Sequence, residues 1–524
     1  MGHDDETEEE RRERKRLKKE KKEKKRSEES ESKKRSAEAE PDLADGEKRS
    51  KKSKKDKRED APPPGSSVSP PSAAEIDAFR SESNIEIFPK EEAAVYPPIL
   101  HFSSLLSQLH SSDKVLESVT SYVALKKFKT PSPIQGQCWP PLLKSRDVIG
   151  IASTGSGKTL TFLVPALLKI ASVGPFKQKS GPPSPRVLVL APTRELAMQS
   201  QQVCEEVGCF RSVCIYGGVP KHFQKSELNA GAEIIVATPG RLQDLVEEGA
   251  VSMQGVAYLV LDEADRMLDE GFEPAIRAII SKCPSTATRQ TVMFSATWPE
   301  EIRQLARTFL KTEIVRVTVG GQDLAANHRV KQIVECIDKF KRDRRLVDLL
   351  QDYHKSRTNR CLIFVLYKKE ADTVQQFLKS KGFAAVAIHG DLSQPQRTDA
   401  LDSFKKGKVP LLIATDVAAR GLDIPQVEYV LNYSFPLTVE DYVHRIGRTG
   451  RGGASGISHT FFTDDDKGLA GALVGVLQEA NQEVPVEIMK YPMVTKKKTS
   501  KLYGDFGPKD DLVGQTAKKT VFED

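Results

Sequence analysis

The chain has 524 residues, too many for one hydrophobic core, so two or three domains are expected. Its 80 Lys and Arg against 73 Asp and Glu leave a net charge of +7, which permits a polyanionic partner without identifying one. The seven cysteines are odd in number and contain no CxxC pair, which excludes a disulfide or zinc framework and favours a reducing compartment. Because the N-terminus lacks an apolar signal core, we expect a soluble, non-secreted protein.

Residues 1–60 consist mainly of Lys, Arg, Glu and Asp, with very few large apolar side chains. Such a segment cannot bury enough area to offset its chain entropy. Together with the proline-rich stretch 61–72, it predicts a disordered charged tail over residues 1–75. Residues 11–26 could instead form a lone solvated helix. The runs KKRSAEAE and KRSKKSKKDKR are typical of nuclear targeting signals.

From about residue 120, short apolar and β-branched runs alternate with helical stretches. The first series is DVIGIA (147–152), RVLVLAPT (186–193), SVCIYGG (212–218), AEIIVATPG (232–240), YLVLDEA (258–264) and TVMFSAT (291–297). The second is CLIFVLY (361–367), AAVAIHG (384–390), PLLIATD (410–416), YVLNYS (429–434) and ISHTFFT (457–463). This alternation predicts an α/β fold with two tandem parallel sheets, each covered by helices on both faces. We expect domains at 100–318 and 328–480, a hinge at VTVGGQDLAANHRV (317–330), and a basic C-terminal tail at 481–524.

A phosphate-binding loop follows the first predicted strand. ASTGSGKT (152–159) has the small residues, lysine and hydroxyl of such a loop, although Ala152 stands where Gly is usual. Its backbone N–H groups and the following helix N-terminus form an anion nest, Lys158 reaches the terminal phosphates, and Thr159 offers a hydroxyl to Mg²⁺. ATP and Mg²⁺ are therefore the expected cofactors, and the loop residues are Ala152, Ser153, Thr154, Gly155, Ser156, Gly157, Lys158 and Thr159.

Two acids end the strand in YLVLDEAD (258–265). Asp262 would hold Mg²⁺ through water, and Glu263 would orient and deprotonate the attacking water. An acidic strand end alone is as often a helix cap. Its position about a hundred residues after a phosphate loop, in the same sheet, favours the metal.

The stretch HRIGRTGR (444–451) places three arginines on a glycine-rich turn of the second domain, where no phosphate loop is visible. If both domains close on one ATP, Arg445, Arg448 and Arg451 could act as arginine fingers on the γ-phosphate. Otherwise they are ordinary solvated charges.

Eleven short motifs in one order carry a family resemblance. They are KFKTPSPIQ (127–135), ASTGSGKT (152–159), APTRELA (191–197), GG (217–218), TPGR (238–241), DEAD (262–265), SAT (295–297), IFV (363–365), HGDLSQPQR (389–397), ATDVAARGLD (414–423) and HRIGRTGR (444–451). Over about residues 100–480 the chain resembles the DEAD-box ATP-dependent RNA helicases. The resemblance implies two RecA-like domains that bind ATP and single-stranded RNA together and unwind or remodel RNA locally.

The resemblance also implies roles for individual residues. Phe128 and Gln135 would recognise adenine, and Asp423 the ribose. Residues for the RNA backbone would be Thr193, Arg194, Gly218, Thr238, Arg241, Gly390, Gln394, Arg397 and Thr415. The residues coupling the ATP and RNA sites would be Ser295 and Thr297, hydrogen-bonded to Asp265, with Arg445. Singly, the RNA candidates could be caps, turns or surface charges. Their shared position on one rim of each sheet favours contacts to phosphates and 2′-hydroxyls.

Two departures from the family pattern are Lys127, where Gly is common, and Ser434, where many relatives have Asp. Together with the Lys-rich N-terminal tail and a short C-terminal KKK segment, FPLTVEDYVHRIGRTGR (435–451) resembles the nucleolar branch that acts on precursor ribosomal RNA of the large subunit. We therefore expect localisation in the nucleus and nucleolus, with a protein activator or a pre-ribosomal particle as a further partner. Three alternatives stay open: a DNA helicase, an ATP-gated RNA clamp without productive unwinding, and a charged tail that acts mainly as a nonspecific RNA anchor.

Overall fold

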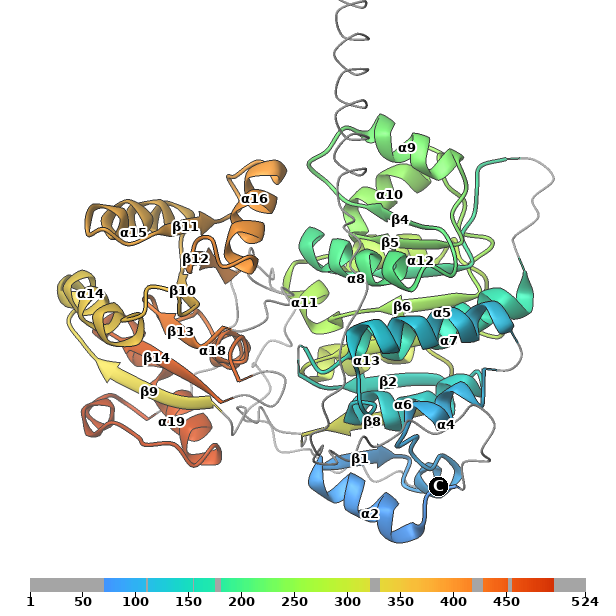
Figure 1. Cartoon of the computed structure of the whole chain (residues 1–524), viewed down its shortest axis with the longest axis horizontal. Helices are drawn as coiled ribbons and strands as arrows, with labels where there is room; N and C mark the ends of the chain where they lie inside the picture. Colours follow the sequence, from blue (N-terminus) through green and yellow to red (C-terminus); the bar gives the residue numbers. More distant parts are fainter. Residues whose placement is uncertain are drawn as a thin grey trace, which may run out of the picture. The chain divides into compact units, whose positions relative to one another are not determined.

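The computed structural model describes residues 70–109, 112–153, 155–174, 181–320, 330–416, 427–450 and 455–493. These residues build an eight-stranded and a six-stranded sheet (Figure 1). We call the part on the first sheet, residues 73–319, lobe 1, and the part on the second sheet, residues 330–493, lobe 2. Almost all of the predicted charged tail, with its basic runs, lies outside the described residues. Among the described residues, no helix combines the length and the apolarity needed to cross a membrane.

The sheet of lobe 1 confirms all six strands predicted there. Its strands in spatial order are β1 (Ile85–Phe88), β8 (Ile314–Val319), β2 (Asp147–Ile151), β7 (Gln290–Ser295), β6 (Tyr258–Leu261), β3 (Val187–Leu190), β5 (Ile234–Ala237) and β4 (Ser212–Ile215). All neighbouring strands are parallel except β1, which runs antiparallel to β8. Strands β1 and β8 were not predicted.

The structure corrects four predicted boundaries. Residues 317–319 belong to β8 and not to a hinge, and residue 330 already begins the first strand of lobe 2. Lobe 1 starts well before residue 100, because β1 and the helix α2 (Ala73–Glu82) belong to it. The last three residues of the predicted tail, 73–75, are the first turn of α2.

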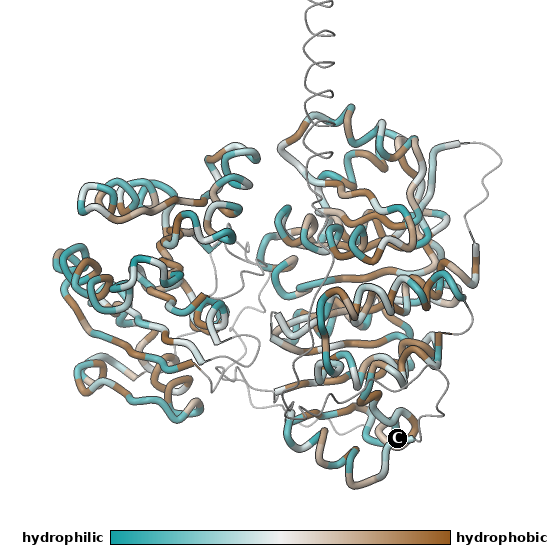
Figure 2. Tube along the Cα trace, in the orientation of Figure 1, coloured by the Kyte–Doolittle hydropathy of each residue, from teal (hydrophilic) through white to brown (hydrophobic). Residues whose placement is uncertain are grey.

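Helices cover both faces of this sheet. They are α2, α3 (Glu92–Val95), α4 (Phe102–Leu106), α5 (Asp113–Lys126), α6 (Pro133–Leu143), α7 (Lys158–Val173), α8 (Arg194–Val207), α9 (Lys221–Asn229), α10 (Pro239–Glu247), α11 (Ala264–Asp269), α12 (Glu273–Ile280) and α13 (Glu300–Phe309). Successive strand residues point to opposite faces. Val187 and Val189 join the core beneath α5 to α8, whereas Leu188 and Leu190 join the core beneath α10 to α13. Strand β3 is accordingly apolar along its whole length (Figure 2).

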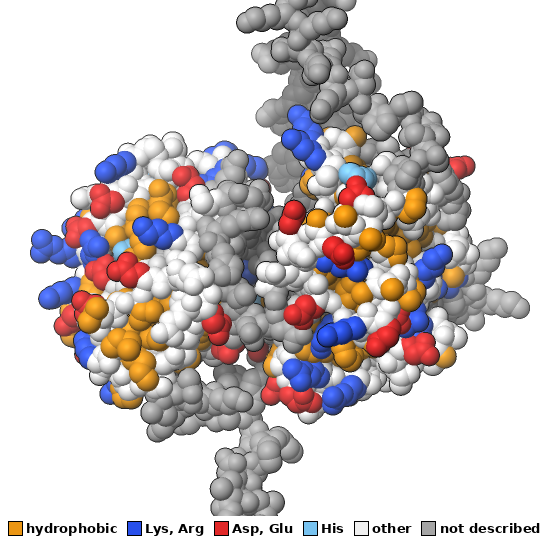
Figure 3. All heavy atoms as spheres, turned by 90° about the horizontal axis from the view of Figure 1, so that it is seen from below, with side chains coloured by type: hydrophobic (Ala, Val, Ile, Leu, Met, Phe, Trp, Pro, Cys, Tyr) orange, Lys and Arg blue, Asp and Glu red, His pale blue; other side chains and the backbone are white. Residues whose placement is uncertain are grey.

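Lobe 2 confirms the five strands predicted there and adds β9. The spatial order is β11 (Ala385–Ile388), β12 (Leu411–Thr415), β10 (Cys361–Val365), β13 (Tyr429–Asn432), β14 (Gly456–Phe462) and β9 (Val330–Cys336), all parallel. Its helices are η1 (Lys339–Lys341), α14 (Arg342–Tyr353), α15 (Lys368–Ser380), α16 (Gln394–Lys405), α18 (Val439–Ile446), η2 (Asp464–Leu469), α19 (Ala470–Glu479) and η3 (Val486–Lys490). On the face that Figure 3 shows, acidic and basic side chains are interspersed.

The predicted C-terminal tail begins too early. Ile488 in η3 is fully buried in the core that contains Phe462 and Leu473. The hydroxyl of Tyr491 donates to Asp464. Residues 481–493 therefore pack on lobe 2, and the remainder of the predicted tail, 494–524, lies outside the described residues.

His459 on β14 makes the stability of lobe 2 depend on pH. Its ring is 5% exposed and lies between the Tyr353 hydroxyl, 3.1 Å from Nδ1, and the Glu335 carboxylate, 2.9 Å from Nε2. Burial lowers the pKa of His459 below its usual range, and more than offsets the opposing effect of Glu335. The unfolded chain therefore binds this proton more readily, with a pKa of about 6.5.

We expect the free energy of unfolding to be highest above about pH 6.5 and to fall as the pH drops below it. The measurement is urea unfolding at several pH values, in which His459→Gln should show a shallower pH dependence than the wild type. His222→Gln, on the exposed surface of α9, is the control and should retain the wild-type dependence. An unchanged dependence in His459→Gln would contradict the assignment.

Candidate functional site

We call the edge of a sheet at which its parallel strands end the carboxyl edge. The strand order divides this edge of lobe 1 into two halves. Strands β2, β7 and β6 are neighbours, and they lead into the phosphate loop, the SAT residues and the two acids. Strands β3, β5 and β4 are also neighbours, and they lead into the residues expected to hold RNA. Ligands of open α/β sheets bind at this edge. The fold therefore places the predicted nucleotide residues on one half of the edge and the predicted RNA residues on the other.

The phosphate loop wraps around the side chain of Lys158. This lysine is 6% exposed, and its Nζ donates to the carbonyl oxygens of Ala152 at 3.0 Å and Ser153 at 3.4 Å. Helix α7 begins at Lys158, so its free N–H groups and the ammonium lie at the same helix end. The Ser156 hydroxyl is buried and has no hydrogen-bond partner among the described residues. Thr154 lies outside them. These groups fit a polyphosphate.

Asp262 supplies a buried oxygen that also fits a metal-bound nucleotide. It is 2% exposed, and its Oδ1 has no hydrogen-bond partner among the described residues. Burial raises the pKa of Asp262 to about 7, although nearby Lys158 opposes the shift. Carboxylate and hydroxyl oxygens are the ligands that Mg²⁺ prefers, so Asp262 and Thr159 suit this ion. When bound, Mg²⁺ would neutralise charge on the phosphate oxygens.

Glu263 follows in a constrained conformation. Its φ is 52°, in the left-handed region that side chains rarely adopt, and the residue is 4% exposed. Strained backbone that the surrounding structure holds in place is common at catalytic sites. A fixed carboxylate beside the nucleotide half of the edge suits the predicted role of general base.

Gln135 connects the adenine motif to the phosphate loop. Its Oε1 accepts from the Ser132 N–H at 2.9 Å, and its Nε2 donates to the Gly157 carbonyl at 3.1 Å. A Cβ at residue 157 would lie 2.6 Å from Nε2, so this contact requires glycine. The amide retains one donor and one acceptor position for an adenine edge. Phe128 is 44% exposed and packs on Phe102, with ring centroids 6.4 Å apart, which leaves ring surface for a base.

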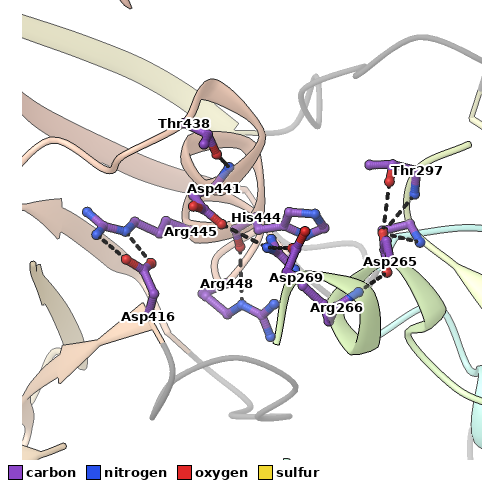
Figure 4. A network of polar contacts seen from close by, with 11 residues as sticks. Asp265, Arg266, Asp269, Thr297, Asp416, Thr438, Asp441, His444, Arg445 and Arg448 are labelled. Atoms are coloured by element: carbon purple, nitrogen blue, oxygen red, sulfur yellow. Dashed lines mark hydrogen bonds and ion pairs between the residues drawn. The ribbon is translucent and has the colours of Figure 1, made fainter. Parts of the chain in front are cut away.

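Asp265 joins the ends of β6 and β7. Its Oδ2 accepts from the N–H groups of Ala296 and Thr297, at 3.1 and 3.0 Å, and from Thr297 Oγ1 at 3.0 Å (Figure 4). Thr297 thus bonds to Asp265 as expected, whereas Ser295 does not. The buried Ser295 hydroxyl has no partner among the described residues. Asp265 lies in α11, beyond the end of β6, and therefore reaches the groups that follow β7 instead of Ser295 inside it.

The structure brings the lobe 1 residues expected to bind RNA to the ends of β3, β4 and β5. The Arg194 guanidinium lies over Gly218, where an added Cβ would be 2.4 Å from Nη1. Arg241 donates to the Val219 carbonyl at 2.9 Å and so ties the β4 loop to α10. Thr193 Oγ1 caps α8 at 3.3 Å from the Leu196 N–H, whereas Thr238 begins α10 without a side-chain cap bond.

In lobe 2, Gly390 is exposed after β11, Gln394 and Arg397 lie on α16, and Thr415 ends β12. An unpredicted partner of this group is Glu195 on α8, which is 3% exposed. Its Oε1 accepts from Arg397 Nη2 at 2.8 Å and from Gln394 Nε2 at 3.3 Å. Glu195 lies in the APTRELA motif, directly after Arg194. The signal that could have identified it is its negative charge, which suits a partner among the arginines predicted to bind RNA.

Arg445 is not a projecting finger. It is 1% exposed, it makes two 2.6 Å contacts to the Asp416 carboxylate, and its Nη1 donates to the Ser434 carbonyl at 2.7 Å. The prediction that it projects was wrong because the residue lies on α18, facing the sheet, and not on the glycine turn. Arg448 is 4% exposed, and its Nε donates to the His444 carbonyl at 3.2 Å (Figure 4). Arg451 and Asp423 lie outside the described residues.

A second unpredicted pair joins the residue after the DEAD motif to α18. Arg266 Nη1 lies 2.8 Å from Asp441 Oδ1 and 2.9 Å from Asp269 Oδ2 (Figure 4). The N–H of Arg266 donates to Asp265 Oδ1 at 3.0 Å. One short segment therefore contacts both the SAT residues, through Asp265, and the helix that carries Arg445.

Two family models match the chain. The DEAD/DEAH box helicase model matches residues 132–305, and the helicase conserved C-terminal domain model matches residues 341–453. The chain is 50% identical to ATP-dependent RNA helicase DBP3 of Eremothecium gossypii, across 86% of this chain and 82% of that protein. It is 56% identical to DEAD-box ATP-dependent RNA helicase 5 of Oryza sativa, across 72% of this chain and 74% of that protein.

Solved structures give the same assignment for both lobes. S. cerevisiae Dbp5 bound to RNA and ADP BeF3 superposes with a TM-score of 0.62 at 30% identity, across 72% of this chain and 94% of that one. Mss116p bound to ssRNA and AMP-PNP superposes with a TM-score of 0.64 at 28% identity, across 75% of this chain and 81% of that one. The two-lobed α/β fold is therefore shared with RNA-bound and nucleotide-bound proteins.

Proposed function

Since the chain belongs to the DEAD-box family of ATP-dependent RNA helicases, enzymes that couple ATP hydrolysis to RNA unwinding, we propose that it unwinds or remodels short RNA duplexes or RNA–protein complexes in ribosomal RNA processing. The observation that carries the chemistry is the buried, unpartnered carboxylate oxygen of Asp262 close to Lys158, on the nucleotide half of the sheet edge. Relatives solved with RNA and ATP analogues support the same ligands here.

Each group at the edge has a defined task in this proposal. The phosphate loop and Lys158 hold the triphosphate, and Asp262 and Thr159 hold Mg²⁺. Glu263 takes the proton of the attacking water. Asp265 links the strand that carries these acids to Thr297, so a change at the nucleotide reaches the end of β7.

RNA would bind along the other half of the edge, through Thr193, Arg194, Gly218, Thr238 and Arg241, and along lobe 2 through Gly390, Gln394, Arg397 and Thr415. Small polar side chains and backbone N–H groups recognise phosphates and 2′-hydroxyls, which carry no sequence information. We therefore expect broad RNA sequence tolerance.

The test of this function is ATP hydrolysis measured with single-stranded RNA, with single-stranded DNA of the same sequence, and without nucleic acid. RNA should stimulate hydrolysis and DNA should not. Equal stimulation by both would favour a DNA helicase. Displacement of a strand from a short RNA duplex should accompany hydrolysis. Long RNA residence with a non-hydrolysable analogue, and no displacement, would instead indicate an ATP-gated clamp.

The cellular part of the proposal is a nucleolar site of action on precursor ribosomal RNA of the large subunit, with a protein activator or a pre-ribosomal particle as partner. It is supported by the Lys-rich segment 1–75 and by the resemblance of FPLTVEDYVHRIGRTGR (435–451) to the nucleolar branch. Crosslinking the protein to RNA in cells and sequencing the bound fragments should enrich precursor ribosomal RNA. Enrichment of messenger RNA alone would contradict the proposed RNA target. The proposed targeting role of residues 1–75 has a separate test: if the protein still accumulates in the nucleus after they are deleted, that role is contradicted.

A further inference from the structure

Tyr367 differs from the other tyrosines that the structure describes in lobe 2. Five of the six have a partner for the ring or the hydroxyl: Tyr353, Tyr429, Tyr433, Tyr442 and Tyr491. Tyr367 is 65% exposed, and its side chain has no hydrogen-bond or ring partner among the described residues. An exposed aromatic ring of this kind is available to a ligand.

The position of Tyr367 relates it to the predicted RNA residues of lobe 2. Val365, the last residue of β10, pairs with Thr415, the last residue of the neighbouring β12. Tyr367 follows two residues later at the start of α15, which places its Cα roughly 8 Å from that of Thr415 by ordinary strand spacings. The side chain makes no cap hydrogen bond to α15. The ring therefore stands at the carboxyl edge, one strand beyond Thr415.

The acidic side chains near this ring have basic partners and therefore do not exclude a polyanion; Glu370 Oε1, for example, lies 3.7 Å from Arg342 Nη1. Lys368 Nζ lies 2.6 Å from Asp391 Oδ1, directly after Gly390, and both side chains are more than half exposed. This pair joins the beginning of α15 to the loop that carries Gly390. It also neutralises the one acidic side chain of that loop, GDLSQPQR, which would otherwise repel phosphates. Lys369 follows with a further positive charge.

We propose that Tyr367 stacks on a base of single-stranded RNA bound along the carboxyl edge of lobe 2. The inference rests on the proposed RNA binding and extends it, because the residues predicted for this edge are polar and suit phosphates and sugars, whereas an aromatic ring suits the flat face of a base. Stacking of this kind tolerates any base, so Tyr367 adds affinity without sequence preference.

The experiment measures RNA affinity of the full chain by fluorescence anisotropy, with a non-hydrolysable ATP analogue and a short single-stranded RNA. Tyr367→Leu keeps an apolar side chain but removes the ring, and should weaken binding by about 5- to 100-fold. Tyr367→Phe keeps the ring and should bind within about twofold of the wild type. On an RNA whose bases are replaced by abasic sites, the wild type and Tyr367→Leu should bind equally, because no base remains to stack.

Phe340→Leu is the matched control, because this ring in η1 of the same lobe is 85% exposed and follows a different strand, β9. It should bind RNA like the wild type. The inference would be overturned if the wild type and Tyr367→Leu bound ordinary RNA with near-equal affinity. It would also be overturned if Tyr367→Leu lost as much affinity for abasic RNA as for ordinary RNA, or if Phe340→Leu lost as much affinity for ordinary RNA as Tyr367→Leu does. RNA-stimulated hydrolysis in the wild type would then still support the proposed function. Absence of any RNA binding by the wild type would contradict both.

Discussion

Lys158→Ala should reduce ATP hydrolysis by at least about 100-fold, the size of loss expected when one preorganised electrostatic group is removed from a reacting centre. The ammonium lies at the start of α7 within the phosphate loop, 3.0 Å from the Ala152 carbonyl, where it can meet the terminal phosphates. Phosphate release in the presence of RNA and Mg²⁺ is the measurement.

The control is Lys169→Ala, about three turns further along the same helix and away from the loop. Its hydrolysis rate should stay close to the wild-type rate. Circular dichroism should show that both variants are folded. A folded Lys158→Ala protein that still hydrolyses ATP at a rate near that of the wild type would refute the nucleotide site.

Arg445→Ala should lower the free energy of unfolding by about 3–5 kcal/mol, because it leaves a largely buried carboxylate without its partner. The Arg445 side chain is 1% exposed, Asp416 is 16% exposed, and the two contacts between them are 2.6 Å long. The Ser434 carbonyl would also lose its donor. Urea unfolding of the full chain should show the effect as an earlier transition.

Arg277→Ala is the comparison, since this arginine forms an ion pair with Glu273 in which both side chains are 45% exposed. An exposed pair of this kind contributes at most about 1 kcal/mol. Arg445→Ala and Arg277→Ala should therefore differ by several-fold in their effect on stability. Equal small effects would mean that the Asp416 contact adds little to lobe 2.

The eleven predicted strands are present because apolar and β-branched runs are compatible with a parallel sheet that helices cover on both faces, and with few other structures. β1 was not predicted because its place in the sheet depends on pairing with β8, more than two hundred residues away. η3 escaped it because the burial of Ile488 depends on a core formed by distant segments. Both elements are specified by tertiary contacts, which a local pattern does not contain.

The site divides in the same way. Motif spacing identified Lys158, Asp262 and Thr297, because each follows a strand whose end is evident in the sequence. The partners of charged residues were not evident. Arg445 with Asp416, Arg397 with Glu195, and Arg266 with Asp441 are pairs of residues that are distant in sequence. Short motifs indicate which residues reach the edge, and only the packed fold determines which of them remain available to a ligand.

The antiparallel pairing of β1 with β8 has a practical consequence for anyone cutting this protein into pieces. β8 also pairs with β2, the strand that leads into the phosphate loop. A fragment starting at residue 100 would leave the backbone N–H and C=O groups of β8 open to pairing between molecules, a known cause of aggregation. The shortest N-terminal fragment that keeps this strand pairing should therefore begin near residue 70, ahead of α2.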